Sequence, residues 1–253
     1  MCIGNSTQRK QSYHRDMFII SPEHFYLYIT IPLVVIWAAL YLVNKETRRE
    51  QKILSLIGAV IGPFSEGFFS REFWLPHGIL PIHLGHRTFL LEDMLFGAAI
   101  VGIAAVIFEV MFRTHQRKFK QSSKKVYEPP HMLLIFIAAF FLALSFGFNS
   151  IYASAFAFLA TAAPLVFFRR DLFLNALFSG IAVLLILFGS YFAIFSLAIN
   201  IGSLMKGAWL IYGTTLGSTL VGIPITQLIW GFSMGFLAGP LYEFVKGFRI
   251  SKR

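Results

Sequence analysis

Seven runs of apolar residues follow one another along the chain, and short polar or basic segments separate them. A helix needs about 20 apolar residues to cross a bilayer, and helical runs satisfy their own backbone polar groups within the hydrocarbon. The pattern therefore predicts seven membrane-spanning helices, at residues 25–43, 53–69, 88–112, 132–148, 151–168, 173–199 and about 220–244.

The segment between the second and third runs, SREFWLPHGILPIHLGHR, differs from the other connections. Its two prolines break it too often for a span, yet it is too apolar to lie free in water. We expect an interfacial or re-entrant cap over the helix ends. Its histidines, His77, His83 and His86, match no standard metal-ligand spacing and no cysteine joins them, so we predict no metal site.

Composition agrees with a membrane protein. Hydrophobic residues make up 57% of the chain and charged residues 13%, against about 45–50% and 25% in soluble domains. Seven spans leave no length for a soluble domain within the 253 residues. The net charge of +10 lies in the connections and not on one amphipathic face, which argues against nucleic-acid binding. The single cysteine, Cys2, excludes an internal disulfide.

Lys and Arg residues are unevenly divided between the two sides of the predicted helices. Sixteen of the 22 fall on the side that receives the odd-numbered loops and the C-terminal tail, and six fall on the other. The positive-inside rule then places the C-terminus in the cytoplasm and the N-terminus outside, in the plasma membrane. In this orientation Glu66, Glu92 and Asp93 all lie toward the outer ends of their helices and can converge on one site.

The third run carries Glu92 and Asp93 within about one turn of its start. An ionisable residue inside a membrane segment indicates a functional site. The alternative is that both acids lie at the interface, near the positive end of the helix dipole, with Thr88 as the helix cap. Glu109, near the end of the same run, is expected to pair with Arg113 one turn on, and Glu243 with Lys246. The alternative is a structural hydrogen bond between Glu109 and Glu243 that links the two parts of the chain in which they recur.

Part of the sequence recurs after a shift of 134 positions, which supports the functional interpretation of the acids. The shift aligns Phe96 with Trp230, Gly97 with Gly231, Phe108 with Tyr242 and Glu109 with Glu243, and brings Trp74 within one position of Trp209. It also aligns Glu66, Glu92 and Asp93 with Asn200, Thr226 and Gln227, so the second copy has lost these three acids.

The recurrence predicts two parallel three-helix repeats, related by an axis along the membrane normal and joined by a linker helix. The chain then divides into a polar N-terminal segment (1–24), a first repeat (25–112), a basic loop with the linker helix (113–150), a second repeat (151–245) and a basic tail (246–253).

Four short motifs resemble the lycopene cyclase domain family of membrane carotene cyclases, in its fused tandem form. They are GPFSEGFF and FWLP before the third run, LLEDMLFG at its start, and GIPITQLIWGF in the second copy. The family's Pro-x-Glu-Glu/Asp motif falls on Leu90 to Asp93, with Leu in place of Pro, and on Pro224 to Gln227, with both acids replaced. The resemblance implies a membrane fold and the cyclisation of a polyene end group.

Cyclising a polyene requires an acid that protonates an isolated double bond and a base that removes a proton elsewhere. A carboxyl group among apolar side chains stays protonated near neutral pH, as a general acid must. We assign Glu92 as the acid and Glu66 or Asp93 as the base, and because adjacent helical residues point about 100° apart, only one of Glu92 and Asp93 can face the pocket. The expected substrate-binding residues are Trp74, Phe96, Asn200, Thr226, Gln227 and Trp230.

The expected partners are the lipid bilayer and an apolar polyene. Net isomerisation consumes no redox cofactor, and the sequence requires none. A role for reduced flavin or nicotinamide stays open. Assembly into a homo- or hetero-oligomer also stays open. Two non-catalytic alternatives also stay open. The loss of acids in the second copy favours a polyene-binding protein or a subunit of a carotenoid enzyme, and the same repeat is compatible with a small transporter.

Overall fold

The computed structural model describes residues 19–69, 72–75, 78–84, 87–118, 127–214 and 217–252. The helices are α1 (Pro22–Val43), α2 (Arg48–Phe69), α3 (Leu91–Phe112), α4 (Pro129–Ser145), α5 (Ser150–Phe168), α6 (Phe173–Leu197), α7 (Ile201–Ala208), α8 (Ile225–Ala238) and α9 (Leu241–Lys246). A single 3-10 turn, Arg170–Leu172, precedes α6. The chain is an all-α membrane protein, as the apolar runs predicted.

Each predicted run overlaps at least one helix. By length and composition, the helices at Pro22–Val43, Leu91–Phe112, Ser150–Phe168, Arg170–Leu197 and Ile225–Lys246 qualify as membrane spans among the described residues. The shorter α4 is also apolar, and α2 begins with a charged turn, Arg48 to Lys52. That the chain crosses the membrane seven times stays a prediction.

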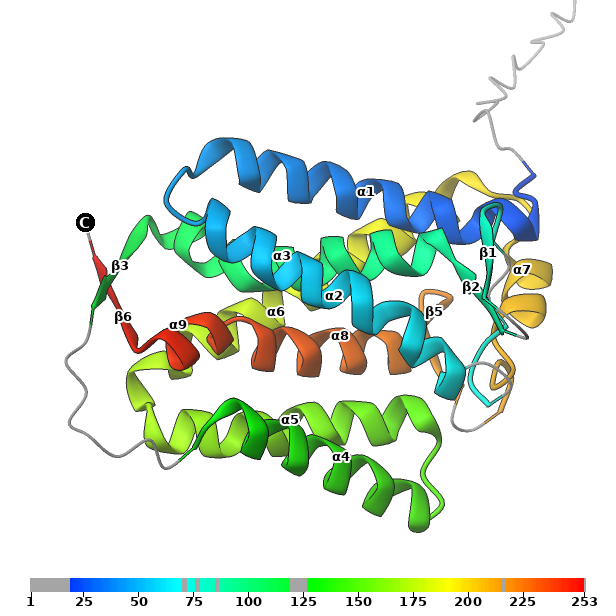
Figure 1. The fold of residues 1–253 in the computed structure, drawn as a ribbon. Helices are drawn as coiled ribbons and strands as arrows, with labels where there is room; N and C mark the ends of the chain where they lie inside the picture. Colours follow the sequence, from blue (N-terminus) through cyan, green and yellow to red (C-terminus); the bar gives the residue numbers. More distant parts are fainter. Residues whose placement is uncertain are drawn as a thin grey trace, which may run out of the picture.

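The long helices lie side by side, and successive helices alternate in direction (Figure 1). One end of the bundle carries α7 and two short antiparallel hairpins, β1 (Pro81–Leu84) with β2 (Arg87–Leu90) and β4 (Thr219–Leu220) with β5 (Ile223–Pro224). The opposite end carries the antiparallel pair β3 (Thr114–Lys118) and β6 (Phe248–Lys252). The described chain therefore begins and ends at opposite ends of the bundle.

Glycines allow the backbones of α2 and α3 to touch. A side chain on Gly58 would collide with the carbonyl of Gly97, and one on Gly62 would collide with the carbonyl of Asp93. Small residues at such crossings are the usual means of close helix packing in membranes. Because Glu66 lies one turn after Gly62, this crossing brings the Glu66 side chain toward the start of α3.

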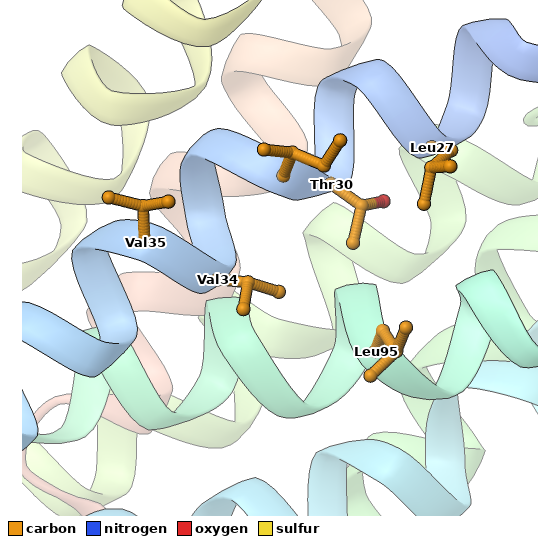
Figure 2. A pocket seen from close by; sticks show the side chains of 6 residues that line it. Leu27, Thr30, Val34, Val35 and Leu95 are labelled. Carbon is orange, nitrogen blue, oxygen red and sulfur yellow. The ribbon is translucent and has the colours of Figure 1, made fainter.

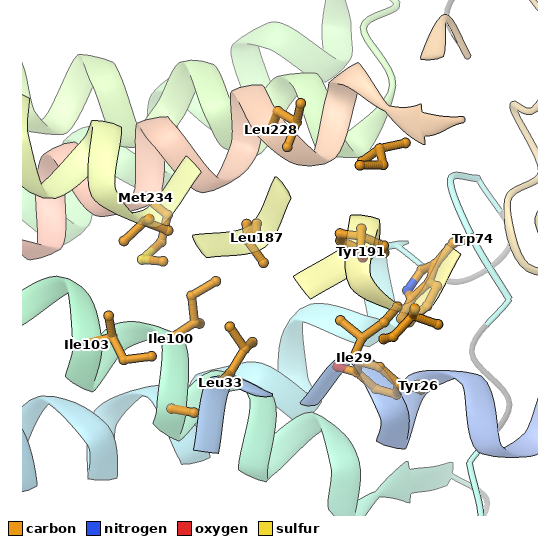
Figure 3. Close-up of a cluster of buried hydrophobic side chains, with 14 of the residues drawn as sticks. Tyr26, Ile29, Leu33, Trp74, Ile100, Ile103, Leu187, Tyr191, Leu228 and Met234 are labelled. Carbon is orange, nitrogen blue, oxygen red and sulfur yellow. The ribbon is translucent and has the colours of Figure 1, made fainter. Parts of the chain in front are cut away.

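A single large apolar core joins α1, α3, α6 and α8 (Figure 3). Its fully buried members include Ile29 and Leu33 of α1, Ile100 and Ile103 of α3, and Leu187 of α6. The helix predicted as a linker, α4, packs on α5 through a separate small cluster of alanine and phenylalanine side chains. The core thus lies between the two predicted repeats.

The capping segments of the two halves are bonded to each other. The backbone N–H of Leu75 donates to the carbonyl of Ala208 at 2.8 Å, and that of Leu210 donates to the carbonyl of Phe73 at 3.0 Å. Between these bonds the indole rings of Trp74 and Trp209 lie 5.6 Å apart. The segment predicted as a cap is therefore held by the segment at the end of α7, residues 208–210, which precedes the β4–β5 hairpin.

Two predicted boundaries are wrong. The third helix begins at Leu91 and not at Thr88, because residues 87–90 pair with residues 81–84 in the β1–β2 hairpin. Thr88 consequently does not cap the helix. The seventh run is broken into α8 and α9 at Gly239 and Pro240, where the proline lacks the N–H that a continuous helix would use.

The predicted surface pairs of Glu109 and Glu243 are also wrong. Both side chains are fully buried, with 0% exposure, and their carboxyl groups are in hydrogen-bonding contact with each other. The side-chain amide of Asn175 on α6 donates to Glu109 Oε1 at 3.1 Å. The pair thus links α3 to α9 inside the protein, where a hydrogen bond between two carboxyl groups requires a proton on one of them.

We expect Glu109→Ala to destabilise the protein, because it removes the buried carboxyl group that contacts the Glu243 carboxyl group and accepts from the Asn175 amide. The cost of removing such a buried partner is about 1–3 kcal/mol. Glu109→Gln retains a donor and an acceptor and should cost less. The measurement is the temperature at which detergent-solubilised protein loses its monodisperse elution peak. Identical temperatures for Glu109→Ala and the wild type would show that the pair stabilises nothing.

Candidate functional site

The site begins with the first turn of α3. Glu92 and Asp93 are both buried, with 1% and 2% exposure, and as neighbours on a helix their side chains leave the axis about 100° apart. The backbone N–H of Leu90 donates to Asp93 Oδ2 at 3.2 Å. This bond fixes the Asp93 carboxyl group at the helix start, while its other oxygen, Oδ1, is buried and accepts no hydrogen bond from the described residues.

Asp93 faces Glu66 and Tyr26. The hydroxyl group of Tyr26, on α1, lies beside the Asp93 carboxyl group, and Glu66, on α2, interacts with Asp93 electrostatically. The indole N–H of Trp74 donates to Glu66 Oε2 at 3.1 Å and lies 3.3 Å from Oε1. Two carboxyl groups from two helices therefore meet, each beside an aromatic residue.

Aromatic rings surround this acid pair. The ring of Tyr26 packs edge-on against Trp74 at 4.9 Å and lies 5.7 Å from Phe96. Figure 3 shows Tyr26 and Trp74 together at one end of the apolar core, with Tyr191 of α6 close by. Trp209 continues the cluster from the second half, 5.6 Å from Trp74 and 6.0 Å from Tyr191.

Glu92 points elsewhere. Its Oε1 accepts hydrogen bonds from the backbone N–H groups of Ile79, at 2.7 Å, and Leu80, at 3.3 Å. These residues lie just before β1, so the Glu92 carboxyl group secures the cap segment to the start of α3. Of the two adjacent carboxyl groups, that of Asp93 faces Glu66, whereas the sequence analysis assigned Glu92 as the acid.

The residues predicted in the second half divide into two groups. Trp230 lies 6.2 Å from Phe96, and Gln227 donates to the hydroxyl group of Tyr191 at 3.3 Å, so both lie near the aromatic cluster. Thr226 is buried with 1% exposure. Asn200, in contrast, holds the segment before α1: its amide accepts from the N–H of Ile20 at 3.1 Å and donates to the carbonyl of Ile20 at 2.8 Å.

Sequence reasoning missed Tyr26 and Tyr191. Both stand in apolar runs, where an aromatic residue usually serves as lipid-facing or core filler. A signal was nonetheless present, because a tyrosine hydroxyl inside a membrane helix needs a hydrogen-bond partner, and few polar groups other than the acids were available. Trp209 had been aligned with Trp74 in the repeat but was not included in the predicted site.

An apolar groove of about 210 Å³ lies between α1 and α3 beside this site (Figure 2). It is lined by Leu27, Thr30, Ile31, Val34, Val35 and Leu95. The hydroxyl group of Thr30 does not contribute polarity, because it donates to the carbonyl of Tyr26 at 2.9 Å. The groove thus presents hydrocarbon beside the helix turns that carry Tyr26 and Asp93.

Within the described ranges, no three His, Cys, Asp or Glu side chains are placed to hold a metal ion. Of the three histidines considered from the sequence, His83 lies exposed on β1, while His77 and His86 fall outside the described residues. The chemistry that the site offers is proton transfer, from two carboxyl groups under a layer of aromatic rings.

Comparison with known proteins identifies a family for part of the chain. Residues 149–245 match the model of the family described as Lycopene cyclase. The matched part extends from α5 into α9 and contains the half in which the acids are replaced, whereas Glu66, Glu92 and Asp93 precede it. Comparisons with curated proteins and with solved structures find no match. The resemblance seen in the motifs is therefore confirmed over residues 149–245, where this membrane protein matches the Lycopene cyclase family.

Proposed function

We propose that this protein cyclises an end group of an apolar polyene of the carotenoid type by proton transfer, without net oxidation or reduction. The observation that carries the proposal is the meeting of Glu66 and Asp93 beneath Tyr26 and Trp74. The family match over the second half supports the same reaction class.

The reaction needs one proton donor and one proton acceptor. A carboxylic acid adds a proton to one carbon of the terminal double bond and leaves a carbocation on the other. The electron pair of a second double bond then forms the carbon–carbon bond that closes the ring, and the positive charge moves into the ring. Loss of a proton to a carboxylate restores a double bond, so the product is an isomer of the substrate.

The hydrogen bonds support one division of the two roles between Asp93 and Glu66. Asp93 accepts a hydrogen bond from the N–H of Leu90, as a carboxylate does, and its Oδ1 is left to take up the departing proton. Glu66 meets the indole N–H of Trp74 and serves as the proton donor. This assignment replaces Glu92, whose carboxyl group holds the cap segment through Ile79 and Leu80.

The aromatic rings protect and stabilise the intermediate. A carbocation is attracted to the π face of an aromatic ring, as other cations are, and a dry apolar surrounding keeps water from adding to it. Trp74, Phe96 and Tyr26 supply rings from the first half. Trp209 and Trp230 supply rings from the second half, the former against Trp74 and the latter against Phe96.

We propose further that the two halves are tandem repeats related by an approximate two-fold axis along the bundle. A residue can touch its own equivalent only near the axis that relates two copies. Three such pairs are in contact along the bundle, namely Trp74 with Trp209, Phe96 with Trp230, and Glu109 with Glu243. The contacts support the division into repeats at 25–112 and 151–245, and the site then lies between one repeat with acids and one without.

The predicted orientation gives the acid pair a position in the membrane. Glu66 and Asp93 lie at the end of the bundle that carries the β1–β2 hairpin, and the C-terminus lies at the opposite end. If the C-terminus is cytoplasmic, as the charge distribution predicts, the reaction takes place toward the outer leaflet. We propose that a substrate dissolved in the bilayer enters through the apolar groove between α1 and α3.

One observation favours a second candidate, a non-catalytic polyene-binding protein: the family match covers the half that lacks the acids. The two candidates are separated by expressing the chain in a bacterium that accumulates a linear carotene such as lycopene and analysing the pigments by chromatography. We expect pigments with cyclic end groups. Exclusively linear pigment, with the protein present in the membrane and bound to that pigment, would establish the binding function instead.

A further inference from the structure

Tyr26 is the one residue of α1 that contacts both the acid pair and the surrounding rings. Its side chain is buried, with 5% exposure. The groups that face its hydroxyl are Asp93, which lies beside it, and Glu66 and Tyr191, which lie within electrostatic range. α1 therefore contributes to a site whose acids come from α2 and α3.

The position of the Tyr26 hydroxyl is fixed on several sides. The edge-on contact with Trp74, with ring planes at 88°, and the contact with Phe96 confine the ring. Ile29, in the next turn, is completely buried in the core and anchors this face of α1. The hydroxyl group thus cannot follow Asp93 if that side chain rotates; the Asp93 side chain must instead orient itself to meet Tyr26.

This geometry matters because the orientation of a base decides which proton it removes. The ring-bearing carbocation has hydrogen atoms on more than one neighbouring carbon, and each gives a different position of the final double bond. Asp93 has one carboxyl oxygen, Oδ2, on the N–H of Leu90, while Oδ1 is buried without a donor. A second fixed contact to the carboxyl group is needed to hold its plane and so to aim Oδ1.

We propose that Tyr26 is a positioning residue, which holds the Asp93 carboxyl group so that one oxygen faces the reacting carbon and a single proton is removed. The inference rests on the proposed cyclisation for its chemical consequence but not for the contact itself. It predicts two separable effects of removing the hydroxyl group: a changed vibrational signature of Asp93, and a changed ratio of ring double-bond isomers.

The test compares Tyr26→Phe with Tyr127→Phe. Tyr127 is also a buried tyrosine, and its hydroxyl group donates to the carbonyl of Thr161 at 2.8 Å, outside the site. Burial raises the pKa of Tyr127 to about 12, so its hydroxyl group is protonated near neutral pH and can act as a donor. We expect Tyr26→Phe to lower kcat by about 10- to 100-fold, with KM nearly unchanged, and to yield a mixture of isomers. Tyr127→Phe should leave both kcat and the isomer ratio unchanged.

The infrared spectrum of the purified protein gives a readout that needs no turnover. The Asp93 band is identified by its loss in Asp93→Asn, and we expect it to shift in Tyr26→Phe and not in Tyr127→Phe. If Tyr26→Phe does not fold, 3-fluorotyrosine incorporated at position 26 alters the strength of the donor with little change of shape and should shift the same band. An Asp93 band that neither change moves would overturn the proposal. If the band shifts in Tyr26→Phe but the wild-type protein makes no cyclic pigment, the proposed function is overturned and the positioning contact stands.

Discussion

Asp93→Asn is expected to abolish ring formation while the protein remains folded in the membrane. The amide has nearly the size of the carboxyl group and can still accept the hydrogen bond from Leu90, but it cannot take up a proton. Positioned acid–base groups typically contribute 10²- to 10⁴-fold to a rate, so we expect a loss of at least about 100-fold. Glu66→Gln should cause a comparable loss, because the amide retains an acceptor for Trp74 and cannot protonate an alkene.

Glu92→Gln is the matched control for this result. Glu92 is the adjacent residue and is equally buried, but its role is to accept the backbone N–H groups of Ile79 and Leu80, which an amide oxygen can also do. We expect it to retain most of its activity at equal protein levels, measured as cyclic pigment per unit of membrane protein. An inactive Glu92→Gln beside an active Asp93→Asn would reverse the assignment and restore Glu92 as the acid.

Gly97→Leu is expected to prevent assembly of the site and to destabilise the whole protein. Any side chain at this position collides with the backbone carbonyl of Gly58, which cannot move unless α2 separates from α3. That separation would also carry Glu66 away from Asp93. Overpacking of this kind costs about 1–3 kcal/mol and occasionally more, and we expect about 3 kcal/mol here because backbone atoms are involved.

Gly189→Leu provides the comparison for Gly97→Leu. Gly189 lies in α6, and a Cβ atom there would meet no atom within 4 Å. Both variants replace a helical glycine by leucine, so any difference reports the crossing of α2 and α3. We expect aggregated or degraded protein for Gly97→Leu and a wild-type elution profile in detergent for Gly189→Leu. Equal profiles would show that the glycine contact does not hold the two helices together.

The positions of the helices could be predicted from the sequence because an apolar run in a membrane has little choice but to be helical. The ends were less predictable, since they depend on partners distant in the chain. Residues 87–90 were assigned to the third helix, but they pair with residues 81–84. The seventh run was taken as continuous although Pro240 lies inside it, and the helix is interrupted there.

The candidate site was only partly predictable for a similar reason. The buried acids were evident, but the choice between Glu92 and Asp93 depends on where the 79–80 backbone and Tyr26 lie. For Glu109 the local rule of pairing one turn along the helix gave the wrong answer. Glu109 continues a stripe of small residues that includes Gly102 and Ala105, and the structure buries this stripe against neighbouring helices. The small residues could therefore have indicated that the carboxyl group faces inward.

The central claim, that ring closure begins with a proton delivered by the protein and ends with a proton returned to it, is tested most directly by isotope incorporation. Detergent-solubilised protein is equilibrated in D2O, so that its carboxyl groups carry deuterium, and is then mixed in excess with a linear polyene for a single turnover. We expect the mass spectrum of the cyclic pigment to show one deuterium for each ring formed, and none in pigment recovered from Asp93→Asn, which should stay linear. Cyclic pigment without deuterium would contradict the account, because its ring would have closed without a proton from the protein.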